Sequence, residues 1–334
     1  MKAVVCTKYG ETADVVELRQ IPEPNAGPNE VLIEVHAASV NPVDFKIQQG
    51  ALKAIRKLDF PFVMGFDVSG VVVAVGAGVQ QFKVGDEVFS RVGAAYMGTF
   101  AEFVKVDEKY VTGKPSNISH QEAAALPLVA LTTWQVLVTT ANVQPGQRVL
   151  IHAGAGGIGS IAIQIAKALG ATVIATTSSK NVAMVKALGA DQVIDYKAQE
   201  FEEVAKDIDV VYETLGGENQ VKSFKVLRPG GILVSIVGIP SSAWAREEGL
   251  PAYMGWLFDL LNWKNRRLAR RQQARFAPVL LQPEGSKLAI IAAMVASGKI
   301  HAVIDRVFPI EQTKDALLYI QSGRAAGKIV ISVK

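Results

Sequence analysis

The first 120 residues alternate short apolar runs, rich in β-branched side chains, with Gly, Pro and Asp. Runs of this length with such boundaries are typical of β-strands. Strands are therefore predicted at 31–40, 69–76, 85–90 and 99–106. Short strands that follow one another this closely favour a small barrel.

From about residue 123 the pattern changes to apolar strands separated by segments of helical period. This alternation is typical of βαβ units on a parallel sheet. Six strands are predicted, which fit a doubly wound nucleotide-binding domain; they lie at 149–153, 172–176, 192–194, 209–212, 231–237 and 275–280.

The last fifty residues return to a helix and two strands, 303–310 and 328–333, without completing another βαβ unit. We therefore expect them to rejoin the first domain. The expected organisation is a β-rich domain at 1–122, an α/β domain at 123–282 with an insertion at about 241–275, and a returning segment at 283–334.

The stretch VLIHAGAGGIGS places a glycine-rich turn between a predicted strand and a predicted helix. At a helix N-terminus, free N–H groups and the helix dipole favour a phosphate, and glycine allows close approach. The turn therefore predicts a dinucleotide site, although a tight turn also needs glycine for steric reasons alone. Its candidate binding residues are Gly154, Gly156, Gly157, Ile158 and Gly159.

The type of dinucleotide is indicated by the end of the second α/β strand. A site for NAD places a carboxylate there, which would repel the 2′-phosphate of NADP. The chain has no acid between Ala171 and Ala190 and instead has Ser178, Ser179 and Lys180. These residues favour NADPH; the alternative is that they form only a helix cap.

Composition narrows the function classes. The formal charge is +4 and the charges are scattered except near residue 265, so nucleic-acid binding is not expected. Met1 leads straight into a strand-like run and not into a charged and then apolar leader, so a signal peptide is not expected. No apolar window is long enough to cross a membrane. A single cysteine excludes an intrachain disulfide, and the cytoplasm is the expected compartment.

Several motifs together resemble the zinc-free quinone oxidoreductase branch, zeta-crystallin-like, of the medium-chain dehydrogenase/reductase superfamily. They are NPVDFK, VGDEV, AAALPLVALTTWQVL, HAGAGGIG, LGADQVIDY and SGRAAGKIVI. The resemblance covers nearly the whole chain. It implies a GroES-like catalytic β-barrel, a Rossmann domain, a cleft between them and a homodimer. It also implies reduction by NADPH of quinones or of the C=C bond of enones and enals.

Zinc is not expected, because a catalytic site needs three protein ligands and a structural site needs four. In zinc-containing relatives a ligand cysteine falls near Asn41 or Pro42, and a ligand histidine falls where this chain has Phe66. Cys6 has no second cysteine beside it, and the histidines are scattered: His36, His120, His152 and His301. Each histidine is interpreted as a packed or surface residue.

Without a metal, a hydrogen-bond donor must stabilise the charge that develops on the substrate carbonyl oxygen. Asn41, Asp44 and Lys46 of NPVDFK are the candidates. In relatives the asparagine lines the nicotinamide pocket and the lysine is placed to donate to the carbonyl. The alternative is a plain Asn-Pro turn with a solvated lysine.

Further cofactor contacts follow from the family pattern. Tyr196 and Arg324 correspond to residues at the adenosine phosphate end, with a strand-end aromatic and a surface charge as the alternatives. Thr132 and Thr133 are expected to open a helix near the nicotinamide ribose. Gly238 ends the fifth strand, where ligands lie in doubly wound sheets.

Segment 256–276 combines apolar bulk with six cations. A basic amphipathic stretch binds an anionic membrane surface or a partner; alternatively, it packs on its own domain or covers the substrate cleft. For the whole protein, three functions remain open: an NADPH-dependent enone or enal reductase, a quinone reductase, and a nucleotide-binding protein with a structural or regulatory role.

Overall fold

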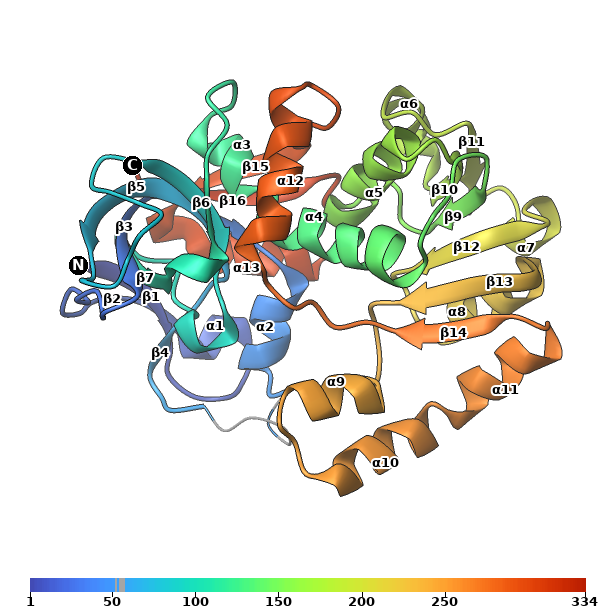
Figure 1. The fold of residues 1–334 in the computed structure, drawn as a ribbon, viewed down its shortest axis with the longest axis horizontal. Helices are drawn as coiled ribbons and strands as arrows, with labels where there is room; N and C mark the ends of the chain where they lie inside the picture. The colour runs from blue at the N-terminus through green and yellow to red at the C-terminus, as the bar shows by residue number, and fades with distance from the viewer. Residues whose placement is uncertain (52, 54–57) are drawn as a thin grey trace. The chain divides into compact units, whose positions relative to one another are not determined.

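The chain forms two compact units in the computed structural model, which describes residues 1–51, 53 and 58–334 (Figure 1). The first unit comprises Met1–Leu131 and Gln282–Lys334, and the second comprises Thr132–Leu281. The boundary thus lies after Leu131 and not after residue 122. Helix α3 (His120–Ala124) packs on strands of the first unit, and in helix α4 (Pro127–Trp134) the N–H of Leu128 donates to Asp67 at 2.9 Å.

The first unit contains two sheets. The smaller has the order β2–β1–β4, with β2 at Val16–Gln20, β1 at Lys2–Cys6 and β4 at Phe62–Val63. The larger has the order β15–β16–β3–β5–β6–β8, with β7 also paired to β3. Its strands are β15 (Ile304–Pro309), β16 (Lys328–Ser332), β3 (Glu30–Val40), β5 (Asp67–Val75), β6 (Glu87–Arg91), β8 (Val111–Gly113) and β7 (Phe103–Asp107). Because β16 pairs antiparallel with β3, the C-terminal segment completes this sheet.

Strand β3 holds the first unit together, because it contributes to two apolar cores. Val31, Ile33 and Val35 belong to one core, whereas Ala38 and Val40 belong to the other. Besides α3, the helices that lie wholly in this unit are α1 (Thr12–Val15), α2 (Pro42–Gln48), α12 (Gly285–Ala296) and α13 (Thr313–Gln321). The last predicted strand of the barrel starts at Phe103 and not at residue 99, because Phe100 instead bonds to Val4 and Met64.

The second unit is built on a six-stranded parallel sheet, as the alternating pattern predicts. Its order is β11–β10–β9–β12–β13–β14, so the chain starts in the middle and winds outward in both directions. The strands are β9 (Arg148–Ile151), β10 (Thr172–Thr177), β11 (Gln192–Asp195), β12 (Ile208–Glu213), β13 (Leu227–Ser235) and β14 (Arg275–Pro278). All six predicted strands are confirmed, with boundaries that differ by a few residues.

Helices α5 (Gly157–Ala168), α6 (Val182–Ala187), α7 (Phe201–Val204) and α8 (Gly217–Ser223) connect the strands of this sheet. Helices α9 (Ser242–Glu247), α10 (Ala252–Leu261) and α11 (Trp263–Arg271) follow β13, and Figure 1 shows α9 and α10 away from the sheet, beyond β14. Alternate strand residues such as Leu150, Ile174 and Leu233 form one apolar core with residues of α7 and α11. No helix in the described residues is long and apolar enough to cross a membrane.

Candidate functional site

The glycine-rich turn joins β9 to α5 in the second unit. The N–H of Gly154 donates to the Thr176 carbonyl at 2.8 Å, which ties the turn to the end of β10. Ala153 has φ of +51°, and a Cβ on Gly159 would lie 2.2 Å from the Ala153 carbonyl oxygen. The close contact explains why glycine is needed at residue 159.

This turn fits the pyrophosphate of a dinucleotide. The first turn of α5 contains Gly157, Ile158 and Gly159, and N–H groups in a first helical turn have no partner within the helix. Gly156 is the N-cap and has no side chain to occupy them. The turn also follows β9, which pairs with both β10 and β12 where the winding direction of the sheet reverses. Ligands of doubly wound sheets bind at this point.

The end of β10 presents the residues predicted to select the cofactor. The side chain of Ser178 is buried, and Asn181 Nδ2 lies 3.5 Å from its Oγ, whereas Ser179 and Lys180 are exposed. At the end of β11, hydrogen bonding from Ser179 holds the pKa of Asp195 below its usual value. The sequence reasoning missed this carboxylate because it belongs to the neighbouring strand. The parallel pairing of β10 with β11, which sets Thr177 beside Asp195, is what brings it to Ser179.

Other predicted cofactor residues are distributed over both units. Tyr196 follows β11 and is 59% exposed, with its N–H donating to Thr177. Thr132 and Thr133 do not open a helix as expected, because α4 already begins at Pro127; both are buried in its second half. Arg324 is exposed between α13 and β16, in the first unit.

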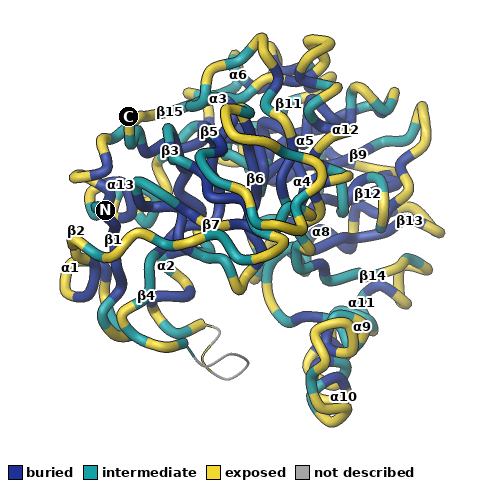
Figure 2. The backbone as a smooth tube through the Cα atoms, turned by 60° about the vertical axis from the view of Figure 1, so that its left-hand side comes forward, coloured by how far each residue is buried: buried dark blue, intermediate teal, exposed yellow. Residues whose placement is uncertain are grey.

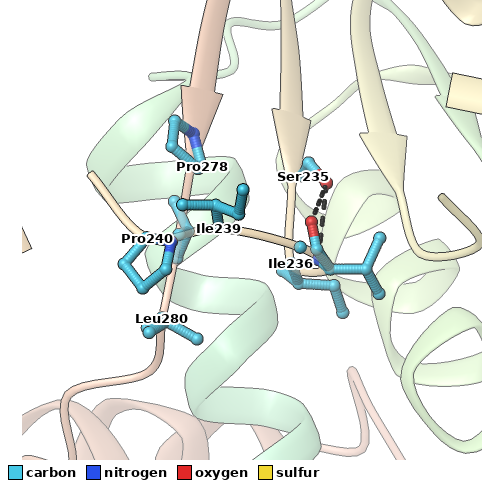
Figure 3. A pocket seen from close by; sticks show the side chains of 9 residues that line it. Ser235, Ile236, Ile239, Pro240, Pro278 and Leu280 are labelled. Atoms are coloured by element: carbon cyan, nitrogen blue, oxygen red, sulfur yellow. Dashed lines mark hydrogen bonds between the residues drawn. The ribbon is translucent and has the colours of Figure 1, made fainter. Parts of the chain in front are cut away.

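Gly238 lines a shallow hollow at the carboxyl ends of β13 and β14, which leaves no room for a water molecule. Figure 3 shows Ile239, Pro240, Pro278 and Leu280 around it. The hydroxyl of Ser235 donates to the Val237 carbonyl at 2.9 Å and accepts from the Val237 N–H at 3.3 Å (Figure 3). These two hydrogen bonds stabilise the turn that follows β13.

A buried polar network lies behind the glycine turn. His152 is 1% exposed; its Nδ1 is 3.1 Å from Thr176 Oγ1 and its Nε2 is 2.9 Å from Ser223 Oγ. Ser223 donates to Glu213, whose other oxygen accepts from the Gly216 N–H at 2.9 Å. Burial lowers the pKa of His152 to about 4, so the ring is neutral at pH 7. The interpretation of His152 as a packed residue is correct, but its network joins β9, β10, β12 and α8.

In the first unit, the NPVDFK motif forms the start of α2. Asn41 is the N-cap, and its N–H donates to Asp44 at 2.7 Å. The Asn41 amide is 1% exposed and is held at both ends: Nδ2 donates to Asp67 at 2.8 Å, and Oδ1 accepts from Lys328. The side chain therefore belongs to a buried polar cluster of the first unit.

Asp44 is the second residue of the motif that is buried beside this polar cluster. Burial raises the pKa of Asp44 to about 7, and its second oxygen has no hydrogen-bond partner among the described residues. Asp67 accepts from Ser39 at 2.9 Å and lies 3.5 Å from the Lys328 ammonium. Sequence reasoning did not select Asp67 and Lys328 as functional residues. Lys46, by contrast, is exposed on α2.

The described residues contain no group of three or more His, Cys, Asp and Glu side chains that could hold a metal ion. Of the residues expected near the ligand positions of zinc-containing relatives, Asn41 is buried in the polar cluster and Phe66 in an apolar core.

Comparison with known proteins relates both units to the same group. Residues 27–116 match the alcohol dehydrogenase GroES-like domain, and residues 188–331 match the zinc-binding dehydrogenase family. The chain is 37% identical to 2-methylene-furan-3-one reductase of Solanum lycopersicum over 99% of its length and 79% of that protein. It is 35% identical to the chloroplastic NADPH-dependent alkenal/one oxidoreductase of Arabidopsis thaliana, with the same coverage.

Among solved structures, the quinone oxidoreductase of Coxiella burnetii superimposes with a TM-score of 0.85 at 32% identity. The match covers 100% of this chain and 99% of that chain. The first unit is thus a GroES-like domain and the second a Rossmann domain, as expected. The chain belongs to the medium-chain dehydrogenase/reductase superfamily and is an oxidoreductase of the group that contains the quinone oxidoreductases and the enone and alkenal reductases.

Proposed function

We propose that this protein is an NADPH-dependent, metal-independent reductase acting on the C=C bond of enones and enals or on quinones. The observation that carries the proposal is the glycine turn, where Gly159 lies against Ala153 at the N-terminus of α5. The names of the relatives, which include an NADPH-dependent alkenal/one oxidoreductase, support the substrate class.

The cofactor would be held by residues of several elements. The N–H groups of Gly157, Ile158 and Gly159 bind the pyrophosphate, while Gly154 and Gly156 leave room for it. Ser178 and Lys180 bind the 2′-phosphate, and Ser179 is held by Asp195. The remaining proposed contacts are Tyr196 and Arg324 at the adenosine end, Thr132 near the nicotinamide ribose, and Gly238 at the end of the fifth strand.

Bound NADPH supplies a hydride to the electrophilic carbon of the substrate. Negative charge then develops on the carbonyl oxygen, and a donor aimed at that oxygen stabilises the transition state. Lys46 is the proposed donor. Asn41 and Asp44 position it, because they cap α2 and Asn41 is itself held by Asp67 and Lys328. Water supplies the proton for the neighbouring carbon.

Metal independence is supported by the residue types of the sequence. The chain has one cysteine, Cys6, and it has Asn41 or Pro42 and Phe66 where zinc-containing relatives have a ligand cysteine and a ligand histidine. A homodimer and a cytoplasmic location are also proposed; the relatives compared above include a chloroplastic protein, so the location stays a prediction.

The proposal is tested by NADPH oxidation with a panel of enones and enals and a panel of quinones, with product analysis. Turnover of enones with a saturated product supports alkene reduction, and turnover of quinones alone supports the second activity. If neither panel is turned over although NADPH binds, the protein is a nucleotide-binding protein without this activity.

Cofactor preference is measured in the same experiment. NADPH should bind at least about tenfold more tightly than NADH, because a charge-assisted contact contributes roughly 1.5–3 kcal/mol. Lys180→Met should remove most of this preference. The matched control is Lys186→Met on α6, another exposed lysine, which should keep it. Equal affinities of the native protein for both cofactors would contradict the roles of Ser178 and Lys180.

A further inference from the structure

Helices α9, α10 and α11 form the insertion between β13 and β14. One side of this insertion packs on the rest of the second unit. Phe258 of α10 is buried and contacts Trp244 of α9. The Asn262 amide donates to the Pro240 carbonyl at 2.9 Å, and Ala269 of α11 is part of the core under the sheet. The insertion is therefore a fixed part of the second unit.

The outer side of α10 is an apolar stripe that faces solvent. Its large apolar residues recur at helical spacing i, i+3, i+4, i+7 and i+8, so they share one face. Trp256 is 86% exposed and Leu260 is 69% exposed. The stripe, together with the first residue of α11, consists of Tyr253, Trp256, Leu257, Leu260, Leu261 and Trp263. Figure 2 colours much of α10 as exposed residues. Of the alternatives for segment 256–276, packing on its own domain therefore holds for Phe258 and Ala269 but not for this face.

The next helix adds positive charge directly beside the stripe. Residues 256–275 contain six cations and one acid, a net charge of +5, and the acid, Asp259, is paired with Arg266 at 2.5 Å. The exposed cations are Lys264, Arg267, Arg270, Arg271 and Arg275. Arg267 lies over the Trp263 ring at 5.3 Å, so charge and aromatic surface meet at the junction of the two helices.

We propose that this face of α10 and α11 binds the surface of an anionic lipid bilayer. Apolar and aromatic side chains enter the boundary between headgroups and acyl chains, while neighbouring arginines pair with anionic headgroups. A second copy of this chain fits less well, because a two-fold interface would bring two patches of charge +5 together. With 10 residues, α10 is far too short to span a bilayer and would lie along its surface.

The test uses the full-length protein and vesicle flotation, and it requires no turnover, so it is independent of the proposed reductase activity. Vesicles of phosphatidylcholine alone are compared with vesicles containing phosphatidylserine. Binding is expected only to the anionic vesicles, and it should weaken in 1 M salt, where the screening length falls to about 3 Å.

Two variants separate the charged and apolar parts. Replacing Arg267, Arg270 and Arg271 by Gln should lower partitioning into anionic vesicles roughly 100-fold, from the loss of three cations near the surface. Trp256→Ser with Leu260→Ser should abolish flotation and the blue shift of tryptophan fluorescence that vesicles cause. Since these side chains are exposed, both variants should keep the native unfolding temperature.

Matched controls carry the same changes elsewhere. Val84→Ser replaces another exposed apolar residue, and the substitution of Lys83, Lys186 and Lys299 by Gln removes three exposed cations. Both controls should bind anionic vesicles as the native chain does. Failure of the native chain to float with anionic vesicles overturns the proposal. The proposal is also overturned if Trp256→Ser changes the oligomeric mass of the protein but leaves flotation unchanged. That result would assign the face to contact with a second copy of the chain.

Discussion

Asp44 and Lys46 lie two residues apart on α2, but only Asp44 is buried. A helix turns by about 100° per residue, so positions two apart point to different sides. Asp44 faces the cluster with Asn41 and Lys328, where a carboxylate caps the helix. Lys46 faces away from it and is exposed to solvent.

Lys46→Met tests the proposed donor. If Lys46 stabilises the charge on the substrate oxygen, the turnover rate with enones should fall about 10–1000-fold, a loss of roughly 1.4–4 kcal/mol of transition-state stabilisation. NADPH affinity should hardly change. The control is Lys8→Met, another exposed lysine of the first unit. Full activity of Lys46→Met on every accepted substrate would show that the lysine is a surface residue.

His152 makes the stability of the protein depend on pH. Its pKa is about 4 in the folded chain and near 6.5 when unfolded, so the unfolded state binds more protons between these values. Stability contributed by neutral His152 is therefore lost as the pH falls from 6.5 towards 4. From pH 7.5 to pH 5 the loss is about 2 kcal/mol.

Urea unfolding of the native chain and of His152→Gln at pH 7.5 and pH 5 measures this contribution. The variant should be less stable at pH 7.5 but should lose about 2 kcal/mol less on acidification. Burial raises the pKa of Glu213, so its contribution has the opposite sign and is lost as pH rises. Glu213→Gln is the control that separates the two. An unchanged pH slope in His152→Gln would contradict the assignment.

At the scale of elements, the strand–turn–helix of residues 148–168 could be predicted closely. The apolar run, the glycines and the helical period are all local, and β9 and α5 begin where that pattern changes. By contrast, α4 starts five residues before Thr132, because Asp67 of a distant strand caps its first turn. Caps supplied from another part of the chain leave no local signal.

Gly159→Ala tests the tight turn as an element. A Cβ at 2.2 Å from the Ala153 carbonyl oxygen forces the turn to move, so NADPH affinity should fall more than about tenfold with a destabilisation of about 1–3 kcal/mol. Calorimetric titration and urea unfolding measure the two effects. Gly113→Ala, where a Cβ would meet nothing within 4 Å, should be nearly neutral. Native NADPH affinity in Gly159→Ala would mean that the phosphates bind elsewhere.

At the scale of the whole molecule, the membership of the superfamily raises the question of zinc, because one matched family is described as zinc-binding dehydrogenase. Metal analysis of the purified chain should find far less than one zinc per protein, and chelators should leave turnover intact. The reason is the set of residues: one cysteine, with Asn41 or Pro42 and Phe66 at the expected ligand positions. Zinc near one per chain, removed together with activity by a chelator, would contradict metal independence.

The sequence by itself determined the α/β class, the six strands of the second unit and the glycine turn, because hydrophobic period and glycine spacing are properties of contiguous residues. Tertiary structure alone decided which distant side chains meet. It brought Asp195 to Ser179 through strand pairing. It also placed the Asn41 side chain between Asp67 and Lys328, and it left the apolar stripe of α10 exposed. Such contacts depend on the packing of separate elements, and periodicity within one element does not encode what that element packs against.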